Sequence, residues 1–334
     1  MDVRIGIVSA LARIDPTGVN GYGGIERATY WMACELARRG HEVLLFGNVD
    51  NGPAPDGWTG VHLITENDVL TPKNYELLVS CDAVSDWTHG KPARWARTKR
   101  YFATTMWTDV MAERGRNIYP SEAVRAKFNE PRAPVIPIGL PIDRSHTDLE
   151  PHDAGWVCFG RVAVHKGTDL SIGVARECGV SPFTVAGHVW PGIDEYYSLM
   201  VAQKCREAGF TYKPDAPNDT AARLLHRASG LLHLHRWLES FSIVAAEALC
   251  HGVPILTTDT GAPQEWVRHT DGGLVVPLKD LEAKRPEALA IARAFFETKW
   301  EGRREGIAKR ARELFDVRLV AERYLALFES PPPK

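Results

Sequence analysis

Two charged side chains early in the second half of the chain are spaced as a phosphate clamp would be. Arg161 and Lys166 lie in the segment Phe159–Gly167 (FGRVAVHKG), after a predicted strand and before a predicted helix. A guanidinium and an ammonium beside a helix N-terminus suit a diphosphate. Two unrelated surface cations would be the usual explanation for this spacing. The position after the first strand of the second half favours the ligand interpretation.

Two carboxylates eight residues apart form the second candidate pair, in the segment Trp237–Glu247 (WLESFSIVAAE). Glu239 ends a predicted loop, and Glu247 lies on a helix that begins near Ser242. The free N–H groups of that helix would point at the ligand of Glu239, with one carboxylate on sugar hydroxyls and the other on ribose hydroxyls. A capping acid followed by an exposed helical acid is the alternative. Apolar neighbours around Glu247 weaken it, because a buried carboxylate requires a partner.

A glycine-rich loop, Gly21–Glu26 (GYGGIE), lies between the first strand and the first helix. Glycines such as Gly23 and Gly24 let the backbone approach a ligand closely and expose N–H groups. The loop is not a G-x-G-x-x-G motif, and it lacks the lysine of a P-loop. A plain tight turn explains it equally well, although its place at the carboxyl end of a strand favours ligand binding.

Strands and helices alternate along the sequence, which predicts an α/β fold with two successive halves, each with a parallel sheet. Residues 143–154 are polar and are expected to link the halves. The predicted strands are Val3–Ser9, His41–Gly47, Gly60–Leu63, Leu77–Ser80, Arg100–Ala103, Ala133–Ile138, Gly155–Gly160, Phe183–Ala186, Gly230–His233, Pro254–Thr258 and Leu274–Val276. The predicted helices are Ile25–Arg39, Ser121–Phe128, Leu170–Cys178, Asp219–Arg227, Ser242–Cys250 and a continuous helical tail, Arg285–Phe328.

The composition is that of an ordinary globular protein of about two domains, with 334 residues and a net charge of −2. This charge gives no global indication of nucleic-acid or membrane binding. The six cysteines are scattered without a C-x-x-C pair, which indicates buried thiols in a reducing compartment. No signal peptide or transmembrane stretch is predicted, and the expected location is the cytoplasm.

The order of several segments resembles the large group of retaining glycosyltransferases with the GT-B fold, which is family 4-like and includes glycogen synthases and mannosyltransferases. The matching segments are GGIER…CELARRGHEV, VIPIGLPID, GR…HKG, ESFSIVAAEAL, HGVPILTTDTGAPQEWV and GGLVVP. The resemblance implies two Rossmann-like domains facing a cleft, with a last helix that crosses back to the N-terminal domain. The expected domains are an acceptor domain at 1–148, a donor domain at 149–315 and the returning helix at 316–334.

The resemblance also implies roles for residues. Arg161 and Lys166 would bind the diphosphate of the donor, Glu239 the transferred sugar and Glu247 the ribose. Catalysis is assigned to Glu239, Arg161 and Lys166. The whole implied donor site comprises Gly23, Gly24, Gly160, Arg161, Lys166, Glu239, Ser240, Phe241, Ser242, Ile243 and Glu247.

The sequence departs from the family pattern in two places. The stretch Thr104–Asp109 lacks the histidine that many members carry after a strand of the N-terminal domain. His89 and Trp107 are the candidates for the acceptor or sugar side, with a purely structural His89 as the alternative. Ser242 stands where the family has glycine, a change expected to adjust the sugar pocket. The segment AGHVWP and the GYGG loop also resemble members that glycosylate secondary metabolites.

The expected reaction is retaining transfer of a hexose from a nucleoside-diphosphate sugar, with UDP as the expected nucleotide, to a hydroxyl acceptor by front-face substitution. No cofactor and no metal are expected, since no D-x-D motif is evident. The acceptor is left open as a saccharide, lipid, secondary metabolite or modified nucleobase, and no stable protein partner is implied. Basic residues at 91–100 suggest weak contact with an anionic surface, or simply a solvated helix face.

Three alternatives remain beside this interpretation. A nucleotide-sugar epimerase on the same fold would need catalytic carboxylates and a histidine that the sequence does not show. A non-catalytic sugar-nucleotide-binding or scaffold protein is disfavoured because all four charged residues are intact. A dinucleotide oxidoreductase lacks its G-x-G-x-x-G motif and the acidic residue after the second strand.

Overall fold

The chain divides into two compact units, an N-terminal unit of Met1–Ile142 with Leu314–Lys334 and a C-terminal unit of Asp143–Glu313. The domain ends expected from the sequence, 148 and 315, lie a few residues further along the chain. The computed structural model describes residues 4–13, 24–48, 61–64, 77–80, 101–104, 117–142, 149, 151–216 and 218–329.

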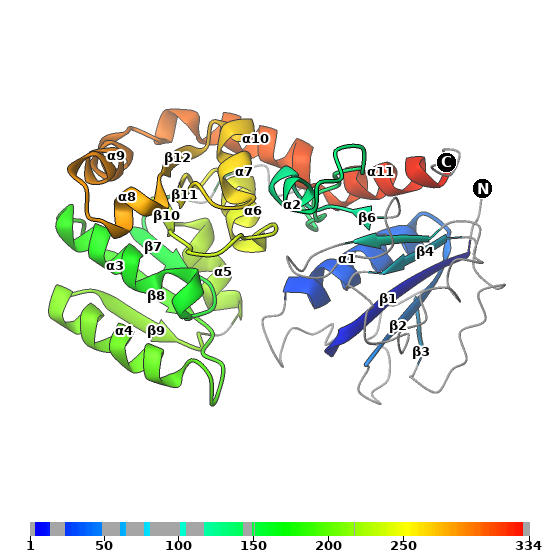
Figure 1. Cartoon of the computed structure of the whole chain (residues 1–334), viewed down its shortest axis with the longest axis horizontal. Coiled ribbons are helices and arrows are strands. Elements are labelled where there is room, and N and C mark those ends of the chain that lie inside the picture. The colour runs from blue at the N-terminus through cyan, green and yellow to red at the C-terminus, as the bar shows by residue number, and fades with distance from the viewer. Residues whose placement is uncertain are drawn as a thin grey trace. The chain divides into compact units, whose positions relative to one another are not determined.

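The N-terminal unit is built on a parallel sheet (Figure 1). Its strand order, β3-β2-β1-β4-β5-β6, reverses direction between β1 and β4, as in a Rossmann-like sheet. Its strands are β1 (Arg4–Arg13), β2 (Glu42–Asn48), β3 (Val61–Ile64), β4 (Leu77–Ser80), β5 (Tyr101–Thr104) and β6 (Asn117–Ile118). Its helices are α1 (Gly24–Arg38), α2 (Glu122–Phe128) and α11 (Val317–Glu329).

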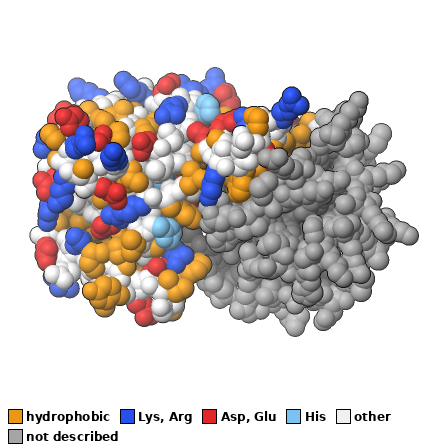
Figure 2. Space-filling view, viewed as in Figure 1, with side chains coloured by type: hydrophobic (Ala, Val, Ile, Leu, Met, Phe, Trp, Pro, Cys, Tyr) orange, Lys and Arg blue, Asp and Glu red, His pale blue; other side chains and the backbone are white. Residues whose placement is uncertain are grey.

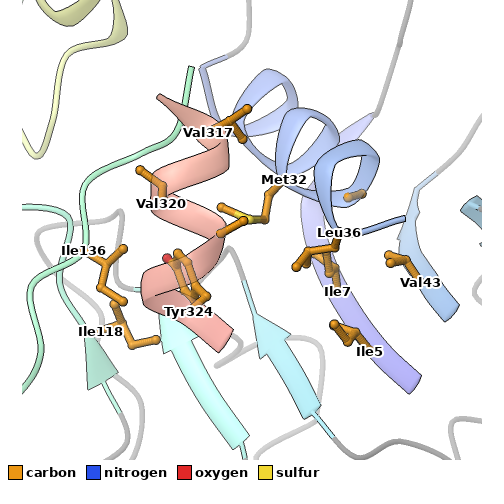
Figure 3. Close-up of a cluster of buried hydrophobic side chains, with 12 residues drawn as sticks. Ile5, Ile7, Met32, Leu36, Val43, Ile118, Ile136, Val317, Val320 and Tyr324 are labelled. Atoms are coloured by element: carbon orange, nitrogen blue, oxygen red, sulfur yellow. The ribbon is translucent and has the colours of Figure 1, made fainter. Parts of the chain in front are cut away.

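Helix α11, from the end of the chain, completes the core of the N-terminal unit (Figure 3). Val317, Val320, Ala321 and Tyr324 follow the i, i+3, i+4, i+7 spacing of one helix face, and all four are buried. They belong to one cluster with residues of β1 and α1, namely Ile5, Ile7, Met32, Ala33 and Leu36. This unit is therefore made from both ends of the sequence.

The C-terminal unit repeats the same strand order, since its sheet runs β12-β11-β10-β7-β8-β9 and every pairing is parallel. Helices α3 and α4 lie on one face of the sheet, and α5, α6 and α7 on the other (Figure 1). Its strands are β7 (Trp156–Phe159), β8 (Phe183–Gly187), β9 (Thr211–Pro214), β10 (Gly230–His233), β11 (Ile255–Thr258) and β12 (Gly273–Val276). Its helices are α3 (Thr168–Glu177), α4 (Glu195–Ala208), α5 (Asn218–His226), α6 (Ile243–Cys250), α7 (Pro263–Thr270), α8 (Leu278–Glu282), α9 (Pro286–Glu297) and α10 (Arg304–Phe315), with short 3-10 turns at Val164–Lys166 and Glu301–Arg303.

The predicted alternation of strands and helices is confirmed, because parallel strands buried on both faces are continuous apolar runs. Every residue of β8, β10 and β11 is buried. Ser121, the first residue of the predicted helix Ser121–Phe128, caps α2, since its hydroxyl accepts a hydrogen bond from the backbone N–H of Val124.

Two predicted elements are wrong. The segment Ala133–Ile138 forms no strand, and only Val135 makes an isolated bridge, to Tyr119. Pro134 and Pro137 explain this, because neither has an N–H to donate to a sheet.

The predicted continuous helix Arg285–Phe328 is instead three helices, α9, α10 and α11. The first break lies at buried Trp300, whose indole N–H donates to the carbonyl of Phe295. The second lies at Asp316, whose carboxylate accepts from the backbone N–H of Arg318 and so begins α11. In the part of the chain that the structure describes, no helix has the length and apolar character needed to cross a membrane.

Candidate active site

The candidate site lies where the strand order of the C-terminal sheet reverses, between β7 and β10. Ligands of such sheets bind at the carboxyl ends of the strands beside this reversal. Arg161 and Lys166 follow β7, and Glu239 follows β10. A close backbone approach joins the two loops: a Cβ on Gly167, which has φ +65°, would lie 1.8 Å from the carbonyl oxygen of Leu234. Only glycine allows this approach, which brings Lys166 to Glu239.

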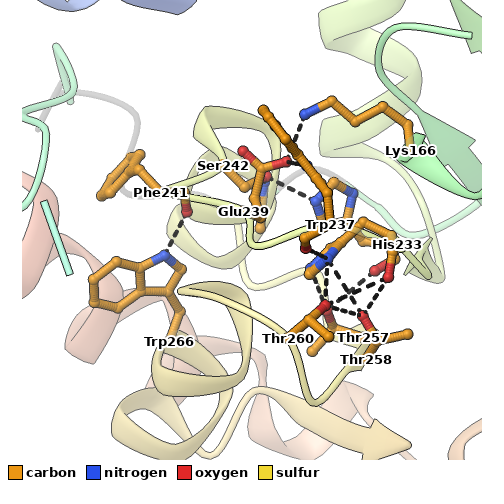
Figure 4. Close-up of polar contacts among 12 residues, drawn as sticks. Lys166, His233, Trp237, Glu239, Phe241, Ser242, Thr257, Thr258, Thr260 and Trp266 are labelled. Atoms are coloured by element: carbon orange, nitrogen blue, oxygen red, sulfur yellow. Dashed lines mark hydrogen bonds and ion pairs between the residues drawn. The ribbon is translucent and has the colours of Figure 1, made fainter. Parts of the chain in front are cut away.

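Lys166 and Glu239 form a direct ion pair, with Nζ 2.5 Å from Oε2 (Figure 4). Trp237 contacts both members. Its indole N–H donates to Glu239 Oε2 at 2.9 Å, and the Lys166 Nζ lies 4.6 Å from its ring centroid. No role was predicted for Trp237, yet this side chain orients the two residues expected to bind the donor.

The carboxylate of Glu239 is ionised although it is only 5% exposed. Burial by itself would raise its pKa, but the adjacent Lys166 ammonium outweighs burial and holds the pKa at about 2. His233 and His235 lie nearby, and burial lowers their pKa values to about 3 and about 4. Both imidazoles are therefore neutral at pH 7, and the lysine supplies the charge that keeps Glu239 ionised.

Arg161 is held from two sides by residues further along the chain. Its Nε donates to Asp194 Oδ2 at 2.6 Å, and its guanidinium carbon lies 3.7 Å from the ring centroid of Trp190. No hydrogen bond joins Arg161 to Lys166 or Glu239 among the described residues. The two cations are thus fixed separately, one by an acid at the start of α4 and the other by Glu239.

Glu247 is the one residue of α6 that is not buried, on a helix whose other side chains lie in the core. A carboxylate in this position was expected to have a partner. One partner is His226, whose Nε2 lies 3.3 Å from Glu247 Oε1. The ring of His226 stacks on that of His251, with centroids 3.4 Å apart. Glu247 thus remains 18% exposed and accessible to a ligand.

Ser242 adopts φ +65°, a left-handed conformation that favours glycine, and so explains why the family pattern has glycine there. Its hydroxyl accepts from the backbone N–H of Ala245 and lies 3.0 Å from His233 Nε2. The side chain is thereby engaged within the protein as the cap of α6. The effect of this Gly-to-Ser change on the sugar pocket stays a prediction.

The residues around Ser242 have structural contacts of their own. Phe241 is buried, and its carbonyl accepts from the indole N–H of Trp266 at 2.7 Å (Figure 4). Ile243 is buried at the first position of α6, and Ser240 is partly exposed. A Cβ on Gly261 would lie 2.3 Å from the Glu239 carbonyl oxygen, so the loop after β11 supports the backbone of Glu239.

Two further polar groups were missed in the sequence. His235 is fully buried, and its Nδ1 lies 2.8 Å from the hydroxyl of Thr260. Arg236 makes a bidentate contact with Asp169 at the start of α3, and the hydroxyl of Tyr197 donates to the same carboxylate. Such pairings between distant loops leave no periodic signal in the sequence.

Several predicted residues lie outside the described part of the chain. These are Gly23, His89, Trp107 and the basic stretch 91–100. Gly24 is the exposed first residue of α1. Gly160 has φ +139° and lies between Phe159 and Arg161, at the end of β7. Among the described residues, no group of three or more His, Cys, Asp or Glu side chains is arranged to hold a metal ion.

Residues 151–313 match the family model described as glycosyl transferases group 1. AviGT4, a glycosyltransferase involved in avilamycin A biosynthesis, is 21% identical, with a TM-score of 0.73, and 98% of this chain and 97% of that chain are covered. Sucrose-phosphate synthase from Thermosynechococcus elongatus is 18% identical, with a TM-score of 0.74 and 98% of each chain covered.

HepE from Anabaena, in complex with UDP and glucose, is 14% identical, with a TM-score of 0.70, and 98% of this chain and 100% of that chain are covered. At these identities the similarity shows a shared fold. No curated protein sequence matches this chain.

Proposed function

The C-terminal unit belongs to the group 1 glycosyltransferases, and the chain has the GT-B fold; from this premise we propose that it moves a hexose from a nucleoside-diphosphate sugar to a hydroxyl acceptor. The observation that carries the proposal is the Lys166–Glu239 ion pair at the reversal of the C-terminal sheet. At this place the Lys166 ammonium can bind a phosphate, and the adjacent ionised Glu239 carboxylate can accept hydrogen bonds from sugar hydroxyls.

We propose UDP as the nucleotide of the donor. This rests on HepE, a structural neighbour described in complexes with UDP, with UDP and glucose, and with UDP-glucose. The diphosphate would bind Arg161 and Lys166, the sugar would bind Glu239, and the ribose would bind Glu247. The partly exposed carboxylate of Glu247 and the buried carboxylate of Glu239 suit these different neighbours.

The proposed reaction retains the anomeric configuration by front-face substitution. The acceptor oxygen forms its bond to the anomeric carbon on the face from which the diphosphate leaves. The bond from that carbon to the diphosphate oxygen breaks, and the acceptor proton passes to the departing phosphate. The protein contributes positioning and the charges of Arg161 and Lys166, which stabilise the negative charge that develops on the leaving group.

Donor binding would divide the Lys166–Glu239 pair between two parts of one ligand. The ammonium would turn to the phosphate, while the carboxylate would accept hydrogen bonds from sugar hydroxyls. Each charge keeps a partner throughout, which avoids the cost of a buried charge left unpaired. We propose that no metal takes part, because the two cations can neutralise the diphosphate.

The test is a thermal-shift panel of nucleotide sugars, run together with measurement of slow donor hydrolysis. One donor, expected to be UDP-hexose, should raise the melting temperature of the wild type. Glu247→Ala and Lys166→Ala should each lose that shift. Lys204→Ala, which removes an exposed lysine from α4, is the control and should keep it.

Three outcomes would contradict the proposal. If no nucleotide sugar shifts the melting temperature, the donor site is wrongly assigned. If a donor binds but is neither hydrolysed nor transferred to any of a panel of saccharide, lipid and secondary-metabolite acceptors, the chain is a sugar-nucleotide-binding protein instead. If the sugar of the bound donor is inverted at one carbon, it is an epimerase.

A further inference from the structure

We propose that Trp190 and Asp194 are positioning residues that lock the Arg161 guanidinium, so that only its terminal amino edge is offered to the donor diphosphate. The inference rests on the function proposed above and extends it to residues that do not themselves touch the donor. Both residues follow β8, in the segment that contains AGHVWP, about 30 positions after Arg161.

Asp194 fixes the inner side of the guanidinium. Its carboxylate accepts from Arg161 Nε at 2.6 Å, and the residue is only 6% exposed. A charged pair with one member this buried keeps its geometry better than a surface pair, because water competes less for its hydrogen bond. The backbone N–H of Asp194 in turn donates to the carbonyl of Trp190, so the two residues stand on one tight turn before α4.

Trp190 fixes the flat face of the same group. The guanidinium carbon lies 3.7 Å from the ring centroid, which is stacking distance for a cation on an aromatic ring. The side chain is 45% exposed, so it is not a core residue held in place by apolar packing. Its described side-chain contact is with Arg161, so we assign this exposed tryptophan the function of holding the guanidinium in place.

The edge of the Arg161 guanidinium that carries Nη1 and Nη2 is left to bind a phosphate. A guanidinium has five N–H donors, and Nε supplies one of them to Asp194. Among the described residues no acceptor bonds the four donors on Nη1 and Nη2, and the side chain is 24% exposed. Those four donors form the fork that grips two phosphate oxygens at once. Because Nε and one face of the guanidinium are occupied, the Nη1 and Nη2 donors are held in a single orientation.

Lys166 offers a different kind of contact. Its ammonium is a point charge already paired with Glu239, so it supplies charge to the ligand without a fixed direction. Directional recognition of the diphosphate would therefore depend on Arg161, and through it on the two residues that hold it.

The experiment is a double-mutant cycle, with Kd measured by calorimetric titration of UDP, GDP, ADP and inorganic pyrophosphate. Trp190→Leu should raise the Kd of the best nucleoside diphosphate roughly 3- to 30-fold, while Trp190→Phe, which keeps an aromatic face, should recover most of the loss. Asp194→Asn, which keeps an oxygen for Nε, should weaken binding less than Asp194→Ala. Tyr196→Leu removes an aromatic ring that is 86% exposed on the same stretch, and should leave Kd unchanged.

The decisive comparison is made in the Arg161→Ala background. There Trp190→Leu should have no additional effect, because Trp190 acts only through the arginine. If the two losses add, Trp190 has a separate role and the inference is overturned. If the wild type binds neither a nucleoside diphosphate nor pyrophosphate, it is the proposed function that fails. Trp190 carries the test because a half-exposed side chain can be replaced without unfolding the unit.

Discussion

Behind Glu239, two imidazoles are buried at the end of β10 and beyond it. Burial lowers the pKa of His233 to about 3 and that of His235 to about 4. In the unfolded chain a histidine titrates near pH 6.5. The unfolded state therefore binds more protons than the folded state as the pH falls below 6.5. These two residues contribute their full stability above that pH and lose it on acidification, through pH 4 and below.

His235→Gln should change how the stability of the protein depends on pH. Between pH 6 and pH 4.5 each of these buried imidazoles should make unfolding easier by about 1.4 kcal/mol per pH unit. The substitution removes one such group, so stability should fall less steeply with pH even if the variant is less stable at pH 7. Urea unfolding at pH 7, 6, 5 and 4.5 measures this slope. A slope equal to that of the wild type would show that the imidazole is not held neutral.

The pH window separates the histidines from the site carboxylate. The pKa of Glu239 is also lowered, to about 2 from its usual 4.5, so it too stabilises the folded state at higher pH. Its contribution is lost only as the pH falls from about 4.5 towards 2. Of the contributions of Glu239, His233 and His235, the part lost above pH 4.5 is therefore that of the two imidazoles.

At the scale of elements, the site depends on how closely the start of α3 approaches the loop after β10. Gly167 permits that contact, because a Cβ there would meet the Leu234 carbonyl at 1.8 Å. Gly179, just after α3, has nearly the same backbone conformation, with φ +66° against +65°, but nothing within 4 Å of a built Cβ. The two glycines share a positive φ and differ in the steric clash that a Cβ would make.

These glycines give a matched pair of substitutions. Gly179→Ala should cost about 1 kcal/mol of unfolding free energy, the usual cost of a left-handed alanine. Gly167→Ala should cost at least about 2 kcal/mol more, because the backbone of two loops must separate. It should also abolish the donor-induced thermal shift, since Lys166 moves away from Glu239, while Gly179→Ala retains it. Equal effects of the two substitutions would mean that the loop contact does not matter.

At the scale of the whole molecule, the N-terminal unit needs a helix that lies far along the chain from its other elements. Helix α11 supplies a complete apolar face to a core that otherwise comes from the first part of the chain. The C-terminal unit carries no such dependence among its described elements, since its sheet and helices come from one continuous stretch, 143–313. Charged side chains of both signs are interspersed over its visible face (Figure 2).

Substitutions in α11 test whether the core of the N-terminal unit depends on this helix. Val320→Ala should lower the unfolding free energy by about 2 kcal/mol, because Val320 is fully buried in the cluster that α11 shares with β1 and α1. Glu322→Ala removes only a surface ion pair with Arg39 and should cost less than about 1 kcal/mol. Guanidinium unfolding of both variants measures the difference. Indistinguishable midpoints would mean that α11 is not part of the core.

The sequence by itself determined the fold class, and it supplied the charged residues of the candidate site. Short apolar runs separated by helical periodicity predict a buried parallel sheet, since burial on both faces leaves no polar alternation. The GR…HKG and E-x7-E segments follow the predicted strands that became β7 and β10. Arg161, Lys166, Glu239 and Glu247 could therefore be named before any contact was known. Elements with little apolar periodicity, such as exposed β9 and helix α4, were missed.

Only the tertiary structure decided which partners these residues have. Asp194 and Trp190 reach Arg161 from another loop, and Thr260 reaches His235 across the neighbouring strand. Such pairs depend on strand register and on the path of each loop, which local sequence preferences do not specify. The division of the final helical stretch at Asp316 has the same cause, because what α11 packs against lies some 300 residues earlier. Residue types set the available chemistry, and long-range packing set its arrangement.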